Sequence, residues 1–275
     1  MTLRIGIINI MPRADEYEGP LRSVLDRSGH DIAPVWIRLS SHAYRSTDPH
    51  HLARHYLSFP QAMDSGPFHG VILTGAPVEE IPFGKVNYWP ELSAILDQAG
   101  RGIPSFLGLC WGGLALARHL GIEKEVYPQK LFGVFATQNL APQDPLMAGL
   151  ARVFPCPQSR HAGLPDQAMA QAQRRGTVRL LARADETGVT IFCTPDLRFV
   201  GHLGHPEYPT RRLAEEYFRD RTRGRADVPR PAGYDPDRPV NSWEADGISF
   251  FRGWLGALRE IAGNRGGAPR KSPPL

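Results

Sequence analysis

The sequence has few cysteines and no long apolar run, and each scarcity excludes a class of protein. Its three cysteines, Cys110, Cys156 and Cys193, are too few and too widely spaced for a disulfide framework or a zinc site, which indicates a reducing compartment. No stretch approaches the roughly 18 consecutive apolar residues of a transmembrane helix. No signal-peptide pattern precedes the first strand-like segment. We therefore expect a cytoplasmic protein without membrane partners.

The sequence also has little net charge for its length. Its 32 Lys and Arg residues against 28 Asp and Glu residues give +4 over 275 residues. This balance argues weakly for anionic ligands and hardly at all for nucleic acid. We interpret the densest basic clusters, at residues 219–230 and 265–271, as solvated surface. With 41% hydrophobic and 22% charged residues, the chain has the composition of a soluble globular domain.

Glycine and proline are abundant, with 28 and 26 residues. Together they exceed the roughly 12% of average composition, so loops must take a large share of the chain. Residues 223–239 hold four prolines and are long for a structureless connection, which is typical of a functional loop or a surface wrap. We expect one domain over residues 1–262 and a disordered tail over 263–275.

Short apolar runs alternate with helical patterns along the chain. The apolar runs are at residues 3–10, 35–39, 70–74, 104–110, 178–181, 190–193 and 198–203, and the helical patterns are at 21–28, 90–98, 111–120 and 210–221. Nearly continuous apolar runs of this length are typical of strands buried on both faces. The alternation predicts an α/β fold, with a doubly wound, mostly parallel sheet and helices on both faces. Ligands of such sheets bind outside the carboxyl ends of the strands.

One strand end carries a candidate nucleophile. Cys110 lies between Gly108 and Gly112, after an apolar run and before a helical pattern, which is the arrangement of a nucleophile elbow with cysteine in place of serine. A helix N-terminus and nearby cations can lower a thiol pKa from about 8.5 to roughly 3.5–7.5. We expect the backbone N–H groups of Trp111 and Ala76 to form an oxyanion hole.

The alternative for Cys110 is a buried cysteine that packs as a small apolar side chain. This is our interpretation of Cys156 and Cys193, which lack flanking glycines of the elbow type. The histidines show no spacing that indicates a metal-ligand set, so we expect neither a metal nor a bound cofactor.

A second strand end supplies a base. A cysteine nucleophile needs a base and a group that orients it. His205 and Glu207 are two residues apart, so in an extended segment both side chains point the same way and the carboxylate can hold the imidazole. His202 is expected to pack against the sheet instead. The trio of Cys110, His205 and Glu207 fits several reactions, from glutamine amide hydrolysis and peptide cleavage to acyl transfer from a thioester.

The motifs resemble a known family. GLCWGG at 108–113, followed by HPE at 205–207, is similar to the class I glutamine amidotransferase superfamily, which has a flavodoxin-like architecture. Further segments narrow the resemblance to the homoserine O-acyltransferase family of methionine biosynthesis, over about residues 3–258. They are NIMP at 9–12, TGAPVE at 74–79, FGKVNYWP at 83–90, KLFGVF at 130–135, SR at 159–160, GHPEY at 204–208 and LAEEYFRD at 213–220. An amidotransferase would not be expected to carry TGAPVE and YWPEL.

The resemblance implies a mechanism and a set of substrates. Cys110 would accept an acyl group from an acyl-coenzyme A as a thioester, His205 would deprotonate the acceptor hydroxyl, and Glu207 would orient His205. The acceptor would be L-homoserine or a related hydroxy amino acid, and the kinetics would be ping-pong. Relatives tend to be dimers, so a homodimer is one possible assembly.

The resemblance also assigns substrate contacts to Lys130, Ser159 and Arg219. An ammonium, a hydroxyl and a guanidinium can together bind the carboxylate of an amino acid and contact the thioester region. Without the resemblance, Arg219 would be a surface helix residue paired with Glu215, and Lys130 and Ser159 would be ordinary loop residues.

Glu79 bears on the acyl donor. In the family this position is glycine in succinyl-specific members and glutamate in acetyl-specific ones. A carboxylate there would repel the free carboxylate of a succinyl group and occupy its space, which favours acetyl-CoA as donor. The alternative is a solvated loop glutamate beside Glu80.

Several positions depart from the family pattern. Tyr17 and Pro20 replace the usual threonine and glutamine, Gln158 replaces a histidine, and Glu244 and Asp246 exchange base for acid in the C-terminal segment. These changes leave open a serine O-acyltransferase or a succinyl-CoA-dependent homoserine O-succinyltransferase. A glutamine amidotransferase-like hydrolase and an inactive binding protein are further alternatives.

Overall fold

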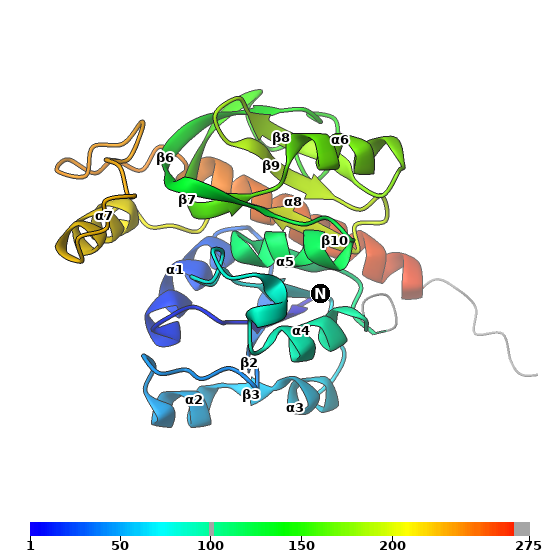
Figure 1. Ribbon diagram of the computed structural model, residues 1–275. Coiled ribbons are helices and arrows are strands. Elements are labelled where there is room, and N and C mark those ends of the chain that lie inside the picture. Colours follow the sequence, from blue (N-terminus) through cyan, green and yellow to red (C-terminus); the bar gives the residue numbers. More distant parts are fainter. Residues whose placement is uncertain (99–101, 267–275) are drawn as a thin grey trace, which may run out of the picture.

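The structure is a computed structural model that describes residues 1–98 and 102–266, and within them ten strands form one sheet (Figure 1). The strands are β1 (Leu3–Ile8), β2 (Ile32–Arg38), β3 (Leu57–Ser58), β4 (Gly70–Leu73), β5 (Phe106–Leu109), β6 (Glu125–Asn139), β7 (Val153–Gly163), β8 (Arg179–Ala184), β9 (Gly188–Cys193) and β10 (Phe199–His202). The helices are α1 (Ala14–Asp26), α2 (Pro49–His55), α3 (Phe59–Asp64), η1 (Phe83–Lys85, a 3₁₀ turn), α4 (Trp89–Leu96), α5 (Trp111–His119), α6 (Asp166–Arg174), α7 (Arg212–Thr222) and α8 (Glu244–Gly266).

The sheet has a parallel part and an antiparallel part. Its strand order is β3-β2-β1-β4-β5-β10-β9-β8-β6-β7, and the pairs from β3 to β10 are parallel. The predicted doubly wound, mostly parallel sheet is confirmed. From β10 to β7 the pairs are antiparallel, and these strands form the upper end of the sheet in Figure 1.

The two longest strands, β6 and β7, were not predicted. Their sequences, EVYPQKLFGVFATQN and VFPCPQSRHAG, mix prolines and charged residues with apolar ones, which hides the strand pattern. Lys130 lies in β6 and Ser159 in β7, so the expectation that both are loop residues is wrong.

Helices cover both faces of the sheet, as predicted. On one face α3, α4, α5 and α6 contribute side chains to a core that includes Trp111 and Phe106. On the other face α1 and α8 pack their apolar sides, including Leu21 and Trp254, against the same strands. The strands between them are therefore buried on both sides, which explains their continuous apolar runs.

Residues 223–239 wrap along a strand, which is one of the two roles that the sequence favoured. The N–H of Lys130 donates to the carbonyl of Asp227 at 2.9 Å, and Ala232 exchanges backbone hydrogen bonds with Phe132 and Val134 at 3.0 and 2.8 Å. The segment thus runs along the part of β6 that lies beyond its short pairing with β8. An unpaired strand edge invites aggregation, so this cover protects it.

The predicted boundary at residue 262 falls inside a helix. Because α8 continues to Gly266, residues 263–266 are helical and the expected disorder does not apply to them. The remaining tail, 267–275, lies outside the described residues. None of the described helices is long and apolar enough to cross a membrane.

Candidate active site

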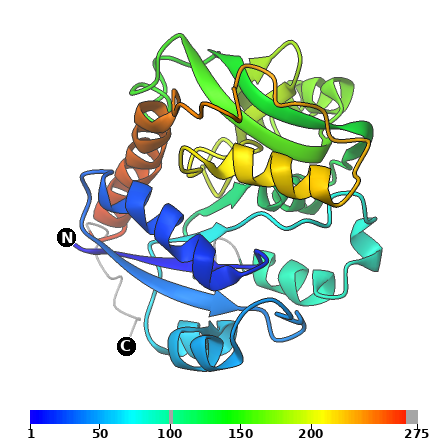
Figure 2. The same ribbon diagram turned by 90° about the vertical axis from the view of Figure 1, so that its left-hand side faces the viewer.

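A pocket of about 340 Å³ opens at the carboxyl ends of the parallel strands. The loops after β1, β4, β5 and β10 contribute to it, together with α1, α7 and the strands β6 and β7. Figure 2 shows α1 and α7 on the same side of the molecule, and residues of both helices line the pocket. Its lining includes Tyr17, Gly75, Ala76, Glu79, Cys110, Lys130, Ser159, His205, Tyr208, Arg212, Glu216 and Arg219. The pocket therefore lies where ligands of such sheets bind.

Cys110 occupies the turn between β5 and α5. It has φ 51° and ψ −114°, a conformation that L residues rarely adopt and that is typical of a nucleophile elbow. Its N–H donates to the carbonyl of His202 at 2.8 Å, which fixes the turn to the neighbouring strand. A Cβ at Gly108 would lie 2.5 Å from the backbone of Gly112, and one at Gly112 would lie 2.3 Å from the carbonyl of Leu73. The turn therefore requires glycine at both positions.

His205 and Glu207 form a buried pair after β10. Nδ1 of His205 lies 2.8 Å from Oε1 of Glu207, and both residues are almost completely buried. The segment is a turn rather than extended, because the N–H of Tyr208 donates back to the carbonyl of His205 at 3.2 Å. The Tyr208 ring stacks on the imidazole with centroids 3.9 Å apart. The turn, the stacking and the carboxylate together hold the imidazole in one orientation.

Cys110 and His205 approach each other across Gly75. A Cβ at Gly75 would lie 3.4 Å from Cβ of Cys110 and 3.7 Å from Cε1 of His205, so both side chains lie within van der Waals distance of this position. Burial opposes the imidazolium, but the charges of Cys110 and Glu207 outweigh burial and raise the pKa of His205 to about 10. This geometry suits a thiolate–imidazolium pair.

The two residues expected to form the oxyanion hole belong to the helix after Cys110 and to the pocket lining. Trp111 is the first residue of α5, where a helical N–H has no partner within the helix. Ala76 lines the pocket in the loop after β4, next to Gly75. This placement is compatible with the expected oxyanion hole, whose role stays a prediction.

His202 lies apart from this pair. It belongs to β10, is 2% exposed, and packs its ring edge-on against Phe250 with centroids 4.7 Å apart. Its Nδ1 accepts a hydrogen bond from the N–H of Gly204 at 3.1 Å. Burial lowers the pKa of His202 to about 4, so the ring is neutral at pH 7. It is a buried packing residue, whose ring contacts α8.

Tyr17 is a site residue that the motifs did not assign. Its hydroxyl donates to Oε1 of Glu207 at 2.8 Å from the other side of the pocket. The sequence signal was only that Tyr17 departs from the family pattern, and the two partners are 190 positions apart in the chain.

Lys130 and Ser159 meet at one carboxylate, that of Glu216. Nζ of Lys130 lies 3.4 Å from Oε2 of Glu216 and 3.1 Å from Oδ2 of Asp220, and the Ser159 hydroxyl donates to the same Oε2. Tyr208 donates to Oε1 at 2.8 Å. Lys130 and Ser159 thus come together at the pocket, as the resemblance implies. They do so through Glu216, with Asp220 beside Lys130, and neither acid was predicted as a site residue.

Arg219 and Arg212 continue this network along α7. Nε of Arg219 donates to Asp220 at 2.8 Å, so the expected pair with Glu215 is wrong. Arg212 donates to Glu216 at 3.2 Å. Burial favours a neutral Glu216, but the charges of Lys130 and Arg212 outweigh burial and lower its pKa to about 2. The spacing of Arg212 and Glu216, four residues apart on a helix, was the available signal for this pair.

Glu79 lines the pocket with its side chain 11% exposed, so it is not a solvated loop residue. Its Oε1 accepts from the N–H of His161 at 3.4 Å and lies 3.8 Å from Nδ1 of that ring. The Lys124 ammonium donates to the Glu79 carbonyl at 2.6 Å and so fixes the loop. The carboxylate is held at the pocket wall.

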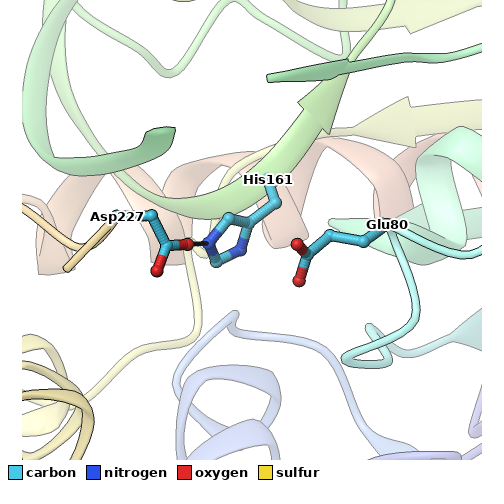
Figure 3. Close-up of side chains that lie close together, drawn as sticks. All are labelled: Glu80, His161 and Asp227. Carbon is cyan, nitrogen blue, oxygen red and sulfur yellow. Dashed lines mark hydrogen bonds and ion pairs between the residues drawn. The ribbon is translucent and has the colours of Figure 1, made fainter. Parts of the chain in front are cut away.

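Glu80, His161 and Asp227 form the one group of potential metal ligands found in the described residues (Figure 3). Nε2 of His161 lies 2.9 Å from Oδ2 of Asp227. The Arg225 guanidinium lies 2.6 Å from Asp227 and 3.3 Å from Glu80, so it is already paired with both carboxylates. Burial opposes protonation of His161, but hydrogen bonds to Glu79 and Asp227 outweigh it and raise its pKa. The group is an ion-pair network at the pocket rim, and a metal ion would have to displace Arg225.

The other residues that differ from the family pattern lie outside the pocket, apart from Pro20. Pro20 belongs to α1 and lines the pocket. Gln158 is buried in β7 and accepts from Nε of Arg160 at 2.9 Å. Glu244 forms an ion pair with Arg27 at 2.9 Å. Asp246 lines a separate small hollow beside Trp243.

The chain is similar to known proteins over most of its length. The profile of the family described as homoserine O-succinyltransferase matches residues 1–260. The chain belongs to this family. It is 36% identical to a homoserine O-acetyltransferase of Brevibacillus brevis over 259 residues, which cover 92% of this chain and 83% of the relative. A homoserine O-acetyltransferase of Bacillus subtilis is 34% identical over 256 residues, covering 92% and 84%. The protein is therefore an acyltransferase.

Solved structures of lower identity share the fold. A glutamine amidotransferase of Thermotoga maritima has a TM-score of 0.60 at 14% identity, with 94% of this chain and 97% of that chain covered. A glutamine amidotransferase of Methylobacillus flagellatus has a TM-score of 0.54 at 15% identity, covering 100% and 98%. At these identities the likeness extends to the architecture alone, which confirms the predicted amidotransferase-like fold.

Proposed function

We propose that the protein transfers an acetyl group from acetyl-CoA, through a thioester on Cys110, to the side-chain hydroxyl of L-homoserine or a closely related hydroxy amino acid. The observation that carries this proposal is the buried set of Cys110, His205 and Glu207 at the base of the pocket. Family membership and the names of the relatives support the acceptor class and the acetyl group.

In the first half-reaction the Cys110 thiolate attacks the thioester carbonyl of acetyl-CoA. The oxyanion of the tetrahedral intermediate forms beside the N–H groups of Trp111 and Ala76. When the intermediate collapses, the carbon–sulfur bond to coenzyme A breaks and the coenzyme A sulfur takes the proton from the His205 imidazolium. Acetyl-Cys110 and a neutral His205 remain.

In the second half-reaction His205 acts as a base. Acylation has removed the thiolate charge that stabilised the imidazolium, so burial has a larger influence and the proton affinity of His205 falls. The neutral imidazole takes the proton of the acceptor hydroxyl as its oxygen attacks the acetyl-Cys110 carbonyl. Collapse of this intermediate releases the O-acetyl amino acid and restores the thiolate and imidazolium.

The acceptor end of the pocket suits a zwitterion. The cations Lys130 and Arg219 lie beside the carboxylates of Glu216 and Asp220, so both signs of charge are present within a few ångströms. An amino acid offers a carboxylate to the cations and an ammonium to the acids. This arrangement supports an amino-acid acceptor.

The donor end suits an acetyl group. The Glu79 carboxylate is held at the pocket wall, where it would face the free carboxylate of a succinyl chain. Placing two like charges together in a partly buried pocket is unfavourable, whereas an acetyl group has no charge to repel. Glu79 therefore favours acetyl-CoA over succinyl-CoA.

The test is to incubate the purified protein with acetyl-CoA or succinyl-CoA, each with homoserine or serine, and to follow release of free coenzyme A. We expect release with acetyl-CoA and one of these acceptors, and a gain of one acetyl group on intact protein exposed to acetyl-CoA alone. Cys110→Ala should abolish this mass gain, and Cys156→Ala, at a buried cysteine outside the pocket, should keep it. No release with either donor would refute the proposal.

A further inference from the structure

The Glu207 carboxylate accepts two hydrogen bonds from side chains, and both end on one oxygen. Nδ1 of His205 and the hydroxyl of Tyr17 each lie 2.8 Å from Oε1. Oε2 is buried without a partner among the described residues. Since Glu207 is 1% exposed, bulk solvent has almost no access to this carboxylate. Tyr17 is therefore half of the support for this carboxylate.

The environment of Tyr17 keeps its hydroxyl protonated, so that it can donate a hydrogen bond. It lies in α1, is 7% exposed and lines the pocket beside Cys110 and His205. Burial and then the charge of Glu207 raise the pKa of Tyr17 well above 10, so its hydroxyl keeps its proton throughout the working range of an enzyme. The motif that places His205 and Glu207 close together contains no such donor.

We propose that Tyr17 is a positioning residue of this acyltransferase, whose hydroxyl holds the Glu207 carboxylate and weakens its attraction for the His205 proton, so that His205 is neutral when the acceptor arrives. This inference rests on the proposed function.

The two half-reactions place opposite demands on His205. The first needs an imidazolium to protonate the leaving coenzyme A, and the second needs a neutral imidazole to accept the proton of the acceptor. A buried carboxylate with no donor other than His205 would attract the proton strongly and keep the imidazolium in the acetyl-enzyme. The Tyr17 hydroxyl donates a hydrogen bond to Oε1, which stabilises the negative charge there and reduces the attraction of the carboxylate for the His205 proton.

Other ionisable groups surround the pair. Those on elements packed against His205 and Glu207 are Tyr17 from α1, Cys110 before α5, Cys156 from β7, His202 from β10, Tyr208 after β10, and Glu216 with Arg212 from α7. Cys156 and His202 are neutral at pH 7, because burial raises the pKa of Cys156 to about 12 and lowers that of His202 to about 4. The charge of Glu216 is balanced by Lys130 and Arg212. Tyr17 is the one of these groups that hydrogen-bonds to Glu207 alongside His205.

The first test needs no substrate. Cys110→Ala removes the thiolate and imitates the uncharged acetyl-enzyme, and histidine labelled with a nitrogen isotope reports the His205 titration by NMR. The His205 signal is identified by its loss in Cys110→Ala/His205→Asn. We expect the pKa of His205 to be higher by about one unit in Cys110→Ala/Tyr17→Phe than in Cys110→Ala. An unchanged or lower pKa would overturn the inference.

The second test follows each half-reaction in the Tyr17→Phe enzyme. Acetylation of Cys110 by acetyl-CoA should keep its wild-type rate at pH 7, whereas transfer to the acceptor should slow about tenfold, so acetyl-enzyme accumulates. The acidic limb of kcat/KM for the acceptor should move to higher pH. Equal slowing of both half-reactions, without a pH shift, would indicate a merely structural role and contradict the inference.

Tyr44→Phe is the matched control. Its hydroxyl donates to the Asn9 carbonyl and accepts from the N–H of Leu39, and it does not line the pocket. It should change neither the His205 titration nor the ratio of the half-reactions. The two proposals fail separately: a shifted His205 titration without any acyl transfer counts against the proposed function, and acyl transfer with an unshifted titration counts against Tyr17.

Discussion

Nζ of Lys130 lies 3.4 Å from Oε2 of Glu216, the same carboxylate oxygen that accepts the hydroxyl of Ser159. Two residues from different strands of the antiparallel part of the sheet are thus joined to α7 by one buried acid. This junction forms part of the pocket wall.

Glu216→Gln should weaken both acceptor binding and stability. The amide lacks the charge that balances Lys130 and Arg212, so we expect the acceptor KM to rise about tenfold and the unfolding free energy at pH 7 to fall by about 2 kcal/mol. Steady-state kinetics and urea unfolding measure the two effects. Glu215→Gln, at the neighbouring position of α7, should change neither.

The stability supplied by Glu216 should depend on pH. Its folded-state pKa of about 2 is below the usual glutamate value of 4.5, so its contribution is complete above about 4.5 and is lost as the pH falls towards 2. Wild-type protein should lose more unfolding free energy than Glu216→Gln between pH 6 and pH 3, measured in urea. Equal losses in the two proteins would show that Glu216 does not titrate in this way.

His205 and His202 should respond very differently to the same substitution. Asparagine places an amide near the position of Nδ1 and removes Nε2, so His205→Asn keeps a donor to Glu207 and loses the base. We expect kcat/KM to fall roughly 10²–10⁴-fold. His202→Asn keeps an acceptor for the N–H of Gly204 and should retain most of the activity. Coenzyme A release is the measurement, and comparable losses in both variants would contradict the assignment of the base.

Glu79→Gly should widen the choice of donor. Removing the carboxylate opens space in the pocket and removes the repulsion of a succinyl group, so the ratio of succinyl-CoA to acetyl-CoA turnover should rise about tenfold or more. Glu80→Gly is the control, because that side chain is half exposed and paired with Arg225. If both variants keep the wild-type ratio, Glu79 does not select the donor.

Gly108→Ala should damage the elbow. The new Cβ would lie 2.5 Å from backbone atoms of Gly112, which have no room to move, and we expect a loss of about 3 kcal/mol of unfolding free energy. Gly256→Ala, within α8, is the control. Apart from its chain neighbours and its own helix backbone, no atom lies within 4 Å of the new Cβ, and alanine should stabilise α8 by roughly 0.5–1 kcal/mol. Urea unfolding of both variants tests the contrast.

The parallel part of the sheet and the pair of His205 and Glu207 were predictable from the sequence because their signals are local. A strand buried on both faces needs a continuous apolar run, and residues two apart are brought close by almost any turn. The antiparallel part was not predictable, since β6 has mixed burial and both β6 and β7 contain prolines and polar residues. Their pairing depends on neighbours that are distant in the chain.

What the sequence by itself determined is the elbow: glycines on both sides of Cys110, after an apolar strand and before a helix, leave the backbone little choice. Only the tertiary structure decided what surrounds that thiol. Tyr17 donates a hydrogen bond to Glu207, which is 190 positions away in the sequence. Glu216 contacts Lys130 from one strand and Ser159 from another. The physical reason is that a buried charge needs hydrogen-bonding or charged partners, and these can come from any part of the chain that packs beside it. A local sequence pattern therefore does not predict them.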